Sequence, residues 1–172
     1  AEMAETIDHQ LGLSRLRRRS PQAGSGTEIG VVADKVINTV RKTIRGAELD
    51  WIIDLMPGLT VALDRSDLSE LVGALVENAA KWAAGVVRVS SLVAAGQVTL
   101  SVEDDGPGMD QAQIDQLGTR GIRLDEQRSG SGIGISIVRE IVSLNAGRLE
   151  FGRSALGGLL VRVGLPAGHT LH

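Results

Sequence analysis

A run of acids and glycines follows an apolar segment in the middle of this sequence, within VEDDGPGM. The apolar residues 97–102 lead into Asp104 and Asp105, and Gly106 and Gly108 come directly afterwards. A carboxylate at the end of a strand can accept a hydrogen bond from an exocyclic amine such as adenine N6. Glycines beside it let backbone approach a flat ring without intervening side chains. The alternative is an ordinary acidic turn, because Asp-Gly is common in turns.

A second group of polar residues lies within LVGALVENAAKWA, where apolar spacing predicts a helix. Asn78 and Lys81 are three residues apart, so they are neighbours on the surface of that helix. An asparagine offers a neutral carbonyl oxygen to a hard cation, and a lysine offers a point charge to a phosphate. A merely hydrophilic helix face is the alternative interpretation.

A glycine-rich segment, RSGSGIGISIV, precedes a strongly apolar stretch that predicts another helix. Its three glycines are Gly130, Gly132 and Gly134. Glycines before a helix allow backbone N–H groups and the positive helix end to face an anion. The segment departs from G-x-G-x-x-G at Ile135 and lacks the Lys-Ser/Thr pair of a P-loop. A flexible hinge is the alternative, but nearby arginines favour phosphate; they are Arg120, Arg123 and Arg128.

Hydrophobic periodicity predicts the elements that must position these groups. The predicted helices span residues 1–19, 31–44, 66–83 and 133–144, and the predicted strands span 51–55, 60–63, 86–93, 97–102, 148–153 and 159–165. Ser66 or Asp67 is the expected N-cap of the third helix, and residues 145–147 are a C-cap for the last. Residues 110–132 form a polar, glycine-punctuated segment. This order predicts an α+β domain with helices over one face of a mixed sheet.

Composition excludes several other classes of protein. The 172 residues are 42% hydrophobic, which is enough for one domain with an appendage. A net charge of −3 gives no argument for binding nucleic acid or an anionic membrane, and the basic residues 15–19 are consistent with a solvated helix end. Without cysteine the chain has no disulfides, and a reducing compartment fits. The scattered histidines cannot form a zinc site together; they are His9, His169 and His172.

These motifs, in this order, resemble the ATP-binding catalytic domain of sensor histidine kinases. That domain belongs to a wider superfamily with gyrase-type ATPases, Hsp90 and the MutL repair proteins. VENAAKW resembles the N box, DDGPGM the first glycine box and GSGIGISIV the second, and the resemblance covers residues 29–166. The stretch TRGIRLDEQRSGSG is most similar to the PhoQ-type sensor kinases. The resemblance implies a two-layer α/β sandwich of the Bergerat type, with a mixed, mostly antiparallel sheet under three helices.

The resemblance also implies roles for residues around a bound base. Asp104 would accept the hydrogen bond from adenine N6, and Gly106 and Gly108 would give the ring its close approach. Trp82 would lie beside the adenine or the ribose.

Other residues would serve the phosphates of ATP and a Mg²⁺ ion. Asn78 would hold the Mg²⁺ that bridges the phosphates, and Lys81 would contact phosphate. The loop at the helix start would be shaped by Gly130, Gly132 and Gly134. Residues 110–129 would form an ATP lid, whose candidate phosphate contacts are Arg123 and Arg128.

Several features of the sequence depart from the family pattern. Ala74 lies one turn before Asn78, where the ATPases carry a catalytic glutamate. An F box between the glycine boxes is not evident. His9 precedes Gln-Leu-Gly, unlike a phosphoacceptor histidine. We therefore expect residues 1–19 to be the end of a dimerisation helix, 20–28 a linker and 29–168 the catalytic domain of a longer, membrane-anchored homodimer.

Three functions compete at this stage. In the first, the domain transfers the γ-phosphoryl group of ATP to a histidine on a separate dimerisation domain of the same protein, in the cytoplasm, for onward signalling to a response regulator. In the second it is a hydrolytic ATPase of the gyrase or Hsp90 kind, which Ala74 argues against. The third is a degenerate module that no longer binds nucleotide, which the presence of Asp104 and Asn78 argues against.

Overall fold

The structure is a computed structural model that describes residues 26–118 and 131–168. Its main sheet contains β2 (Asp50–Asp54), β4 (Val86–Ala94), β5 (Gln97–Asp104), β6 (Arg148–Arg153) and β7 (Leu159–Pro166). The strand order is β2-β4-β5-β7-β6; β2 and β4 are parallel, and the other neighbouring pairs are antiparallel. A small second sheet pairs β1 (Thr27–Glu28) with β3 (Thr60–Val61). The sheet is therefore mixed and mostly antiparallel, as predicted.

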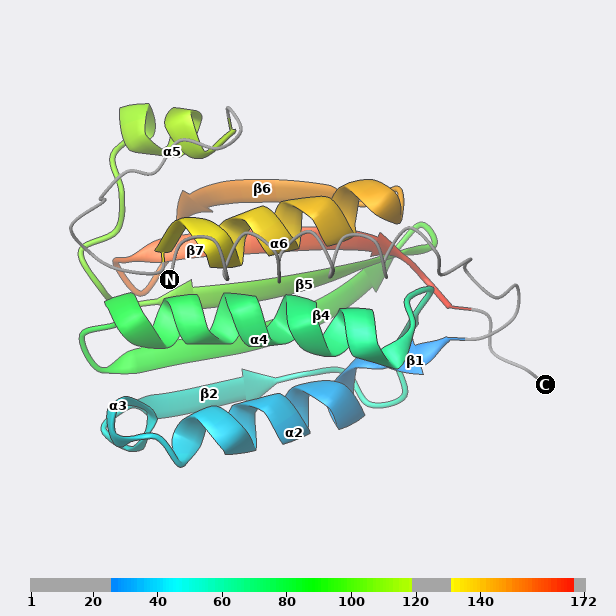
Figure 1. Cartoon of the computed structure of the whole chain (residues 1–172), viewed down its shortest axis with the longest axis horizontal. Helices are drawn as coiled ribbons and strands as arrows, with labels where there is room; N and C mark the ends of the chain where they lie inside the picture. Colours follow the sequence, from blue (N-terminus) through cyan, green and yellow to red (C-terminus); the bar gives the residue numbers. More distant parts are fainter. Residues whose placement is uncertain (1–25, 119–130, 169–172) are drawn as a thin grey trace, which may run out of the picture.

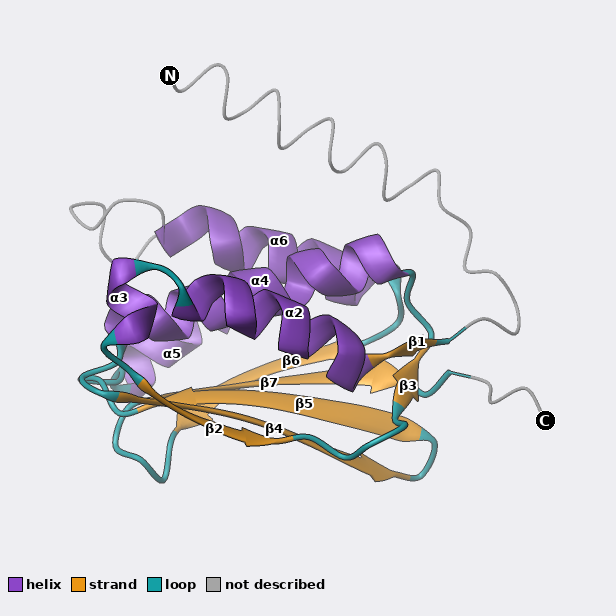
Figure 2. Cartoon of the chain, turned by 90° about the horizontal axis from the view of Figure 1, so that it is seen from below, coloured by secondary structure: helices purple, strands orange, loops and turns teal. Residues whose placement is uncertain are grey.

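Three long helices cover one face of this sheet. They are α2 (Ile29–Arg41), α4 (Arg65–Trp82) and α6 (Ser131–Leu144). They lie side by side in one layer, with α4 between the other two, and the sheet forms the second layer (Figures 1 and 2). This arrangement confirms the predicted two-layer sandwich. Among the residues that the structure describes, no helix combines the length and the apolar character that crossing a bilayer requires.

The core lies between α4 and the central strands. Alternate residues of β5 face it, so Val98, Leu100 and Val102 are buried while the residues between them are not. The apolar stripe of α4 is buried against them and consists of Leu68, Leu71, Val72, Leu75, Val76 and Ala79. Burying each large aliphatic side chain contributes about 1.5–3 kcal/mol to folding. Because α4 also packs against α2 and α6, its position on the sheet is set from three sides.

The boundaries of most predicted elements differ from the structure by one to three residues, and three of these differences are informative. The N-cap of α4 is Asp64, not Ser66 or Asp67, because the Asp64 side chain accepts the Asp67 N–H at 2.8 Å. Residues 27–28, expected in the linker, form β1, and α2 begins at residue 29 instead of 31. Strand β5 continues two residues further than predicted and ends at Asp104, which pairs with Val87.

Two short helices were not predicted. The first, α3 (Ile44–Ala47), begins after Thr43, whose side chain accepts the Gly46 N–H at 3.0 Å. The second, α5 (Gln111–Gly118), lies against β6, where the sequence suggested only a polar segment. Its first turn has a capping box: the Gln113 N–H donates to Asp110 Oδ1 at 2.8 Å, and the Asp110 N–H donates to Gln113 Oε1 at 3.0 Å.

Candidate functional site

The C-terminal half of α4 carries three of the predicted site residues. Asn78 and Trp82 are half-buried, whereas Lys81 is exposed. Residues 78, 81 and 82 are three and four positions apart, so they share one flank of the helix. Lys81 Nζ lies 5.9 Å from the centroid of the Trp82 ring, which is within cation–π range. The groups suited to a cation, a phosphate and a flat ring therefore gather on one helix flank.

Both glycine motifs reach this same helix. A Cβ at Gly106 would lie 2.1 Å from the carbonyl oxygen of Trp82, so the loop after β5 packs directly on the last turn of α4. A Cβ at Gly134, in the first half of α6, would lie 3.9 Å from the Ala74 Cβ. Three motifs that are far apart in the sequence thus meet on one half of α4.

Asp104 is a buried carboxylate, with 2% of its surface exposed. Its Oδ1 accepts the backbone N–H of Gly106 at 2.8 Å and that of Leu159 at 3.4 Å. Burial raises the pKa of Asp104; these two hydrogen bonds oppose the rise only in part, and the charge of Asp105 adds to it. The strand end therefore presents a hydrogen-bond acceptor that water reaches poorly.

Glycines form the walls around Asp104. A Cβ at Gly158 would lie 2.1 Å from Asp104 Oδ1 and 2.4 Å from the Asp104 carbonyl oxygen, and the Gly158 N–H donates to that oxygen at 3.0 Å. Gly108 has a φ of +68°, and its Cβ would lie 3.3 Å from the Gly158 backbone. Gly158 was not among the predicted site residues; the Gly157-Gly158 pair between two predicted strands was the available signal. Gly106, Gly108 and Gly158 are thus required by contacts within the protein.

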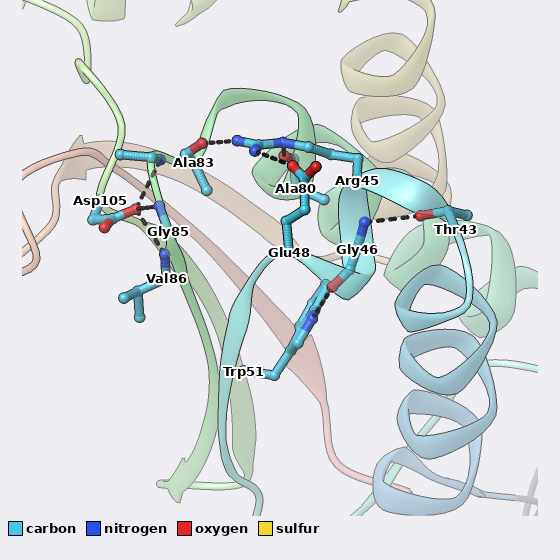
Figure 3. A network of polar contacts seen from close by, with 11 residues as sticks. Thr43, Arg45, Gly46, Glu48, Trp51, Ala80, Ala83, Gly85, Val86 and Asp105 are labelled. Carbon is cyan, nitrogen blue, oxygen red and sulfur yellow. Dashed lines mark hydrogen bonds and ion pairs between the residues drawn. The ribbon is translucent and has the colours of Figure 1, made fainter.

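Asp105 has a different environment, although it follows Asp104 directly. Its Oδ1 accepts three backbone N–H groups, those of Ala84, Gly85 and Val86, each at 2.9 Å (Figure 3). Desolvation is the largest single influence and would raise the pKa of Asp105, but the three hydrogen bonds together outweigh it and lower that pKa. Asp105 therefore stabilises the turn between α4 and β4, a role that the sequence did not predict.

The structure places the remaining predicted residues less completely. Gly132 lies in the first turn of α6. Arg123, Arg128 and Gly130 lie outside the described residues, as do residues 1–25. Within residues 26–118 and 131–168, no three His, Cys, Asp or Glu side chains come together in a way that would hold a metal ion.

Comparison with known proteins identifies similar sequences. Residues 63–169 match the model of the family described as histidine kinase-, DNA gyrase B-, and HSP90-like ATPase. The sensor protein kinase CarS of Pseudomonas aeruginosa is 38% identical over 165 residues, which are 96% of this chain and 37% of CarS. The two-component sensor PhoQ of the same organism is 32% identical over 94% of this chain and 36% of its own length. The chain thus spans about a third of the length of these relatives.

A solved structure has the same architecture. The mycobacterial sensor histidine kinase MprB superposes with a TM-score of 0.74 at 26% identity, covering 85% of this chain and all of the MprB chain.

Proposed function

The chain belongs to the family of histidine kinase-, DNA gyrase B- and HSP90-like ATPases, and we propose that it catalyses the transfer of the γ-phosphoryl group of ATP to a histidine on a dimerisation domain. The observation that carries this proposal is the meeting of three motifs on α4. A buried acceptor, Asp104, lies beside a helix flank that offers Asn78, Lys81 and Trp82. Of its relatives, CarS is named a sensor protein kinase and PhoQ a two-component sensor.

Asp104 is proposed to recognise the base. Its buried carboxylate would accept the N6 amine of adenine, whereas guanine has a carbonyl oxygen at the equivalent position and would be rejected. Gly106 and Gly108 are proposed to let the backbone of the loop after β5 approach the ring closely, and Trp82 would flank the adenine or the ribose.

We assign the phosphates and a Mg²⁺ ion to the part of the site around Asn78 and Lys81. The donor set fits Mg²⁺ that arrives with the nucleotide: Asn78 supplies one neutral oxygen, and phosphate oxygens and water would complete the shell. When bound, Mg²⁺ neutralises charge on the phosphates. Lys81 would contact phosphate, and so would the side chains of Arg123 and Arg128. Backbone N–H groups around Gly130, Gly132 and Gly134 would also face the phosphates.

Phosphoryl transfer depends mainly on position and charge. The bond between the γ-phosphorus and its bridging oxygen breaks to leave ADP, a P–N bond forms with the imidazole, and the imidazole loses a proton. Ala74 supplies no carboxylate that could activate water, which favours transfer to histidine over hydrolysis. We propose that the acceptor histidine belongs to a dimerisation domain whose last helix includes residues 1–19. The full-length protein is then a membrane-anchored homodimer that works in the cytoplasm with a response regulator.

Calorimetry tests the binding part of the proposal. The chain is titrated with ATP and with GTP, each with Mg²⁺ and with EDTA. We expect ATP to bind, more tightly with Mg²⁺, and GTP to bind at least about tenfold more weakly, because one acceptor would face another. Equal affinity for the two nucleotides would contradict the assignment of Asp104.

A labelling experiment tests the reaction. The chain is incubated with γ-labelled ATP and Mg²⁺, with and without the histidine-bearing domain of a relative such as PhoQ. Acid-labile label is expected on the added domain only, and slowly, because the two parts are not tethered. Rapid phosphate release by the chain alone would favour the hydrolytic ATPase, and label on His9 would contradict the division into domains.

A further inference from the structure

Arg45 connects α3 to the end of α4. It lies 33 residues before Asn78 in the sequence and on a different element. Its Nε donates to the carbonyl oxygen of Ala80 at 3.0 Å, and its Nη2 donates to the carbonyl oxygen of Ala83 (Figure 3). Its Nη1 lies 3.4 Å from a carboxylate oxygen of Glu48. The Arg45 guanidinium therefore contacts the backbone directly before and directly after residues 81–82.

The end of α4 suits such a contact. The last carbonyl groups of a helix have no partner within the helix and carry partial negative charge. The Ala83 N–H satisfies the Ala79 carbonyl at 2.9 Å, and Arg45 takes the next one, that of Ala80. A planar guanidinium holds its N–H donors in a rigid fork, so it can bind two separated carbonyl groups at once, whereas a lysine ammonium has its donors on a single atom.

Arg45 is itself held in place. Its helix is capped by Thr43, and a Cβ at Gly46 would lie 1.8 Å from the Val40 carbonyl oxygen, so α3 packs tightly on the end of α2. The indole N–H of Trp51, on β2, donates to the Gly46 carbonyl oxygen at 3.0 Å. The α3 backbone that carries Arg45 is thus fixed to both layers of the domain.

Asp105 holds the opposite side of the same turn. It accepts the N–H groups of residues 84–86, while Arg45 donates to the carbonyl groups of Ala80 and Ala83 (Figure 3). Trp82 lies between the two carbonyls bound by Arg45, and its own carbonyl oxygen packs on Gly106. Arg45 therefore holds the end of α4 itself, whereas Asp105 holds the turn that follows it.

We propose that Arg45 is a positioning residue for the nucleotide site, which holds Lys81 and Trp82 at the distance from Asp104 that the nucleotide requires. The inference rests on the proposed function, because it assigns these residues to the same ligand. Arg45 does not touch the nucleotide in this scheme. It acts through the backbone of α4, so its loss loosens the helix end and misplaces the side chains that contact ATP.

The test compares four variants of the chain by calorimetry with Mg-ATP, well below the unfolding temperature. Arg45→Ala removes both carbonyl contacts, and Arg45→Lys restores one. Arg148→Ala is the matched control, because it removes an exposed arginine from β6, which lies at the opposite edge of the sheet from β2. Val163→Ala, in the core at β7, is the control for lost stability alone.

We expect Arg45→Ala to weaken ATP binding about tenfold. This is smaller than the loss of about a hundredfold in rate that a displacement of about 1 Å can cause at a catalytic centre. Arg45→Lys should recover about half of this loss on a logarithmic scale, and both controls should stay within about twofold of the unmodified chain. The Trp82 indole N–H resonance, assigned with Trp82→Phe, should move in Arg45→Ala and keep its position in the controls.

Two results separate the inference from the proposed function. If the unmodified chain binds ATP and Arg45→Ala binds it equally well, the positioning role is wrong and the function stands. If the unmodified chain does not bind ATP, the proposed function is wrong. An unchanged Trp82 resonance in Arg45→Ala would then also show that Arg45 does not position the end of α4.

Discussion

Asp104 and Asp105 are adjacent in the sequence but belong to two regions of opposite electrostatic character. Asp104 is buried at the end of β5, receives two backbone hydrogen bonds and has a raised pKa. Asp105 is half-buried beside the α4–β4 turn, receives three and has a lowered pKa. The first region leaves an ionisable acceptor poorly solvated, whereas the second uses the same chemical group to stabilise the fold.

The alternation of a β-strand accounts for the difference. Burial along β5 follows every second residue, at 98, 100, 102 and 104, so Asp104 occupies the next core-facing position after three aliphatic residues. Asp105 comes one residue later, beyond the strand, where it meets the N–H groups of residues 84–86. A polar group placed at a core position costs stability, and such a cost is typical of a site that serves a ligand.

The largest expected effect comes from closing the space around Asp104. In Gly158→Ala the new Cβ would lie 2.1 Å from Asp104 Oδ1 and 2.4 Å from the Asp104 backbone oxygen. The end of β5 and the start of β7 must therefore move apart. We expect a loss of about 4 kcal/mol or more in the free energy of unfolding, measured by urea titration. Gly157→Ala is the control: its φ is +108° with nothing nearby, and the backbone strain alone should cost about 1–3 kcal/mol. Equal losses would show that the fit around Asp104 is loose.

Asp104→Asn should separate binding from stability. The amide keeps an oxygen for the Gly106 N–H but places a donor where adenine N6 needs an acceptor. ATP affinity should fall tenfold to a hundredfold, or about 1.5–3 kcal/mol by calorimetry. The free energy of unfolding should stay within about 1 kcal/mol or rise, because a neutral group is buried instead of a charged one. A stable variant with full ATP affinity would refute the role of Asp104.

Asp105→Asn should show the opposite pattern. The three hydrogen bonds lose their ionic character, and we expect a loss of about 1–3 kcal/mol in the free energy of unfolding. ATP affinity should change less than about fivefold, since Asp105 acts only on the turn. Asp34→Asn, at an exposed position of α2, is the control and should alter neither quantity. The contrast between the two regions would collapse if Asp105→Asn weakened ATP binding as much as Asp104→Asn.

The smallest expected effect is in the pH dependence of stability. The folded pKa of Asp105 is lowered, so its contribution is fully present above the ordinary value of 3.8 and is lost as the pH falls through the folded pKa. The folded pKa of Asp104 is raised, so its contribution is present below 3.8 and is lost as the pH rises through the folded pKa. The free energy of unfolding is measured by urea titration between about pH 2 and pH 7. Its decrease below pH 3.8 should become smaller in Asp105→Asn, and its decrease as the pH rises above 3.8 should become smaller in Asp104→Asn. Parallel profiles in both variants would contradict these assignments.

Periodicity was sufficient to predict most elements of the fold. The long helices carry apolar residues at helical spacing, and β4 and β5 alternate around Ala95 and Gly96, whose φ values of 52° and 76° close the hairpin. It missed α3 and α5, since helices of 4 and 8 residues are too short to show a period. The capping box of Asp110 and Gln113 was the one local signal for α5.

The sequence by itself determined which chemical groups the domain carries and in what order: an acid and glycines after a strand, a polar flank on a helix, and glycines before another helix. Residue types and local spacing are enough for that conclusion. Only the tertiary structure decided which of the two acids is buried, why Gly158 must be glycine, and that Arg45 holds the end of α4. Those properties depend on contacts between residues 35 or more positions apart. The chain brings such residues together only when α3 packs on α4 and β5 pairs with β7.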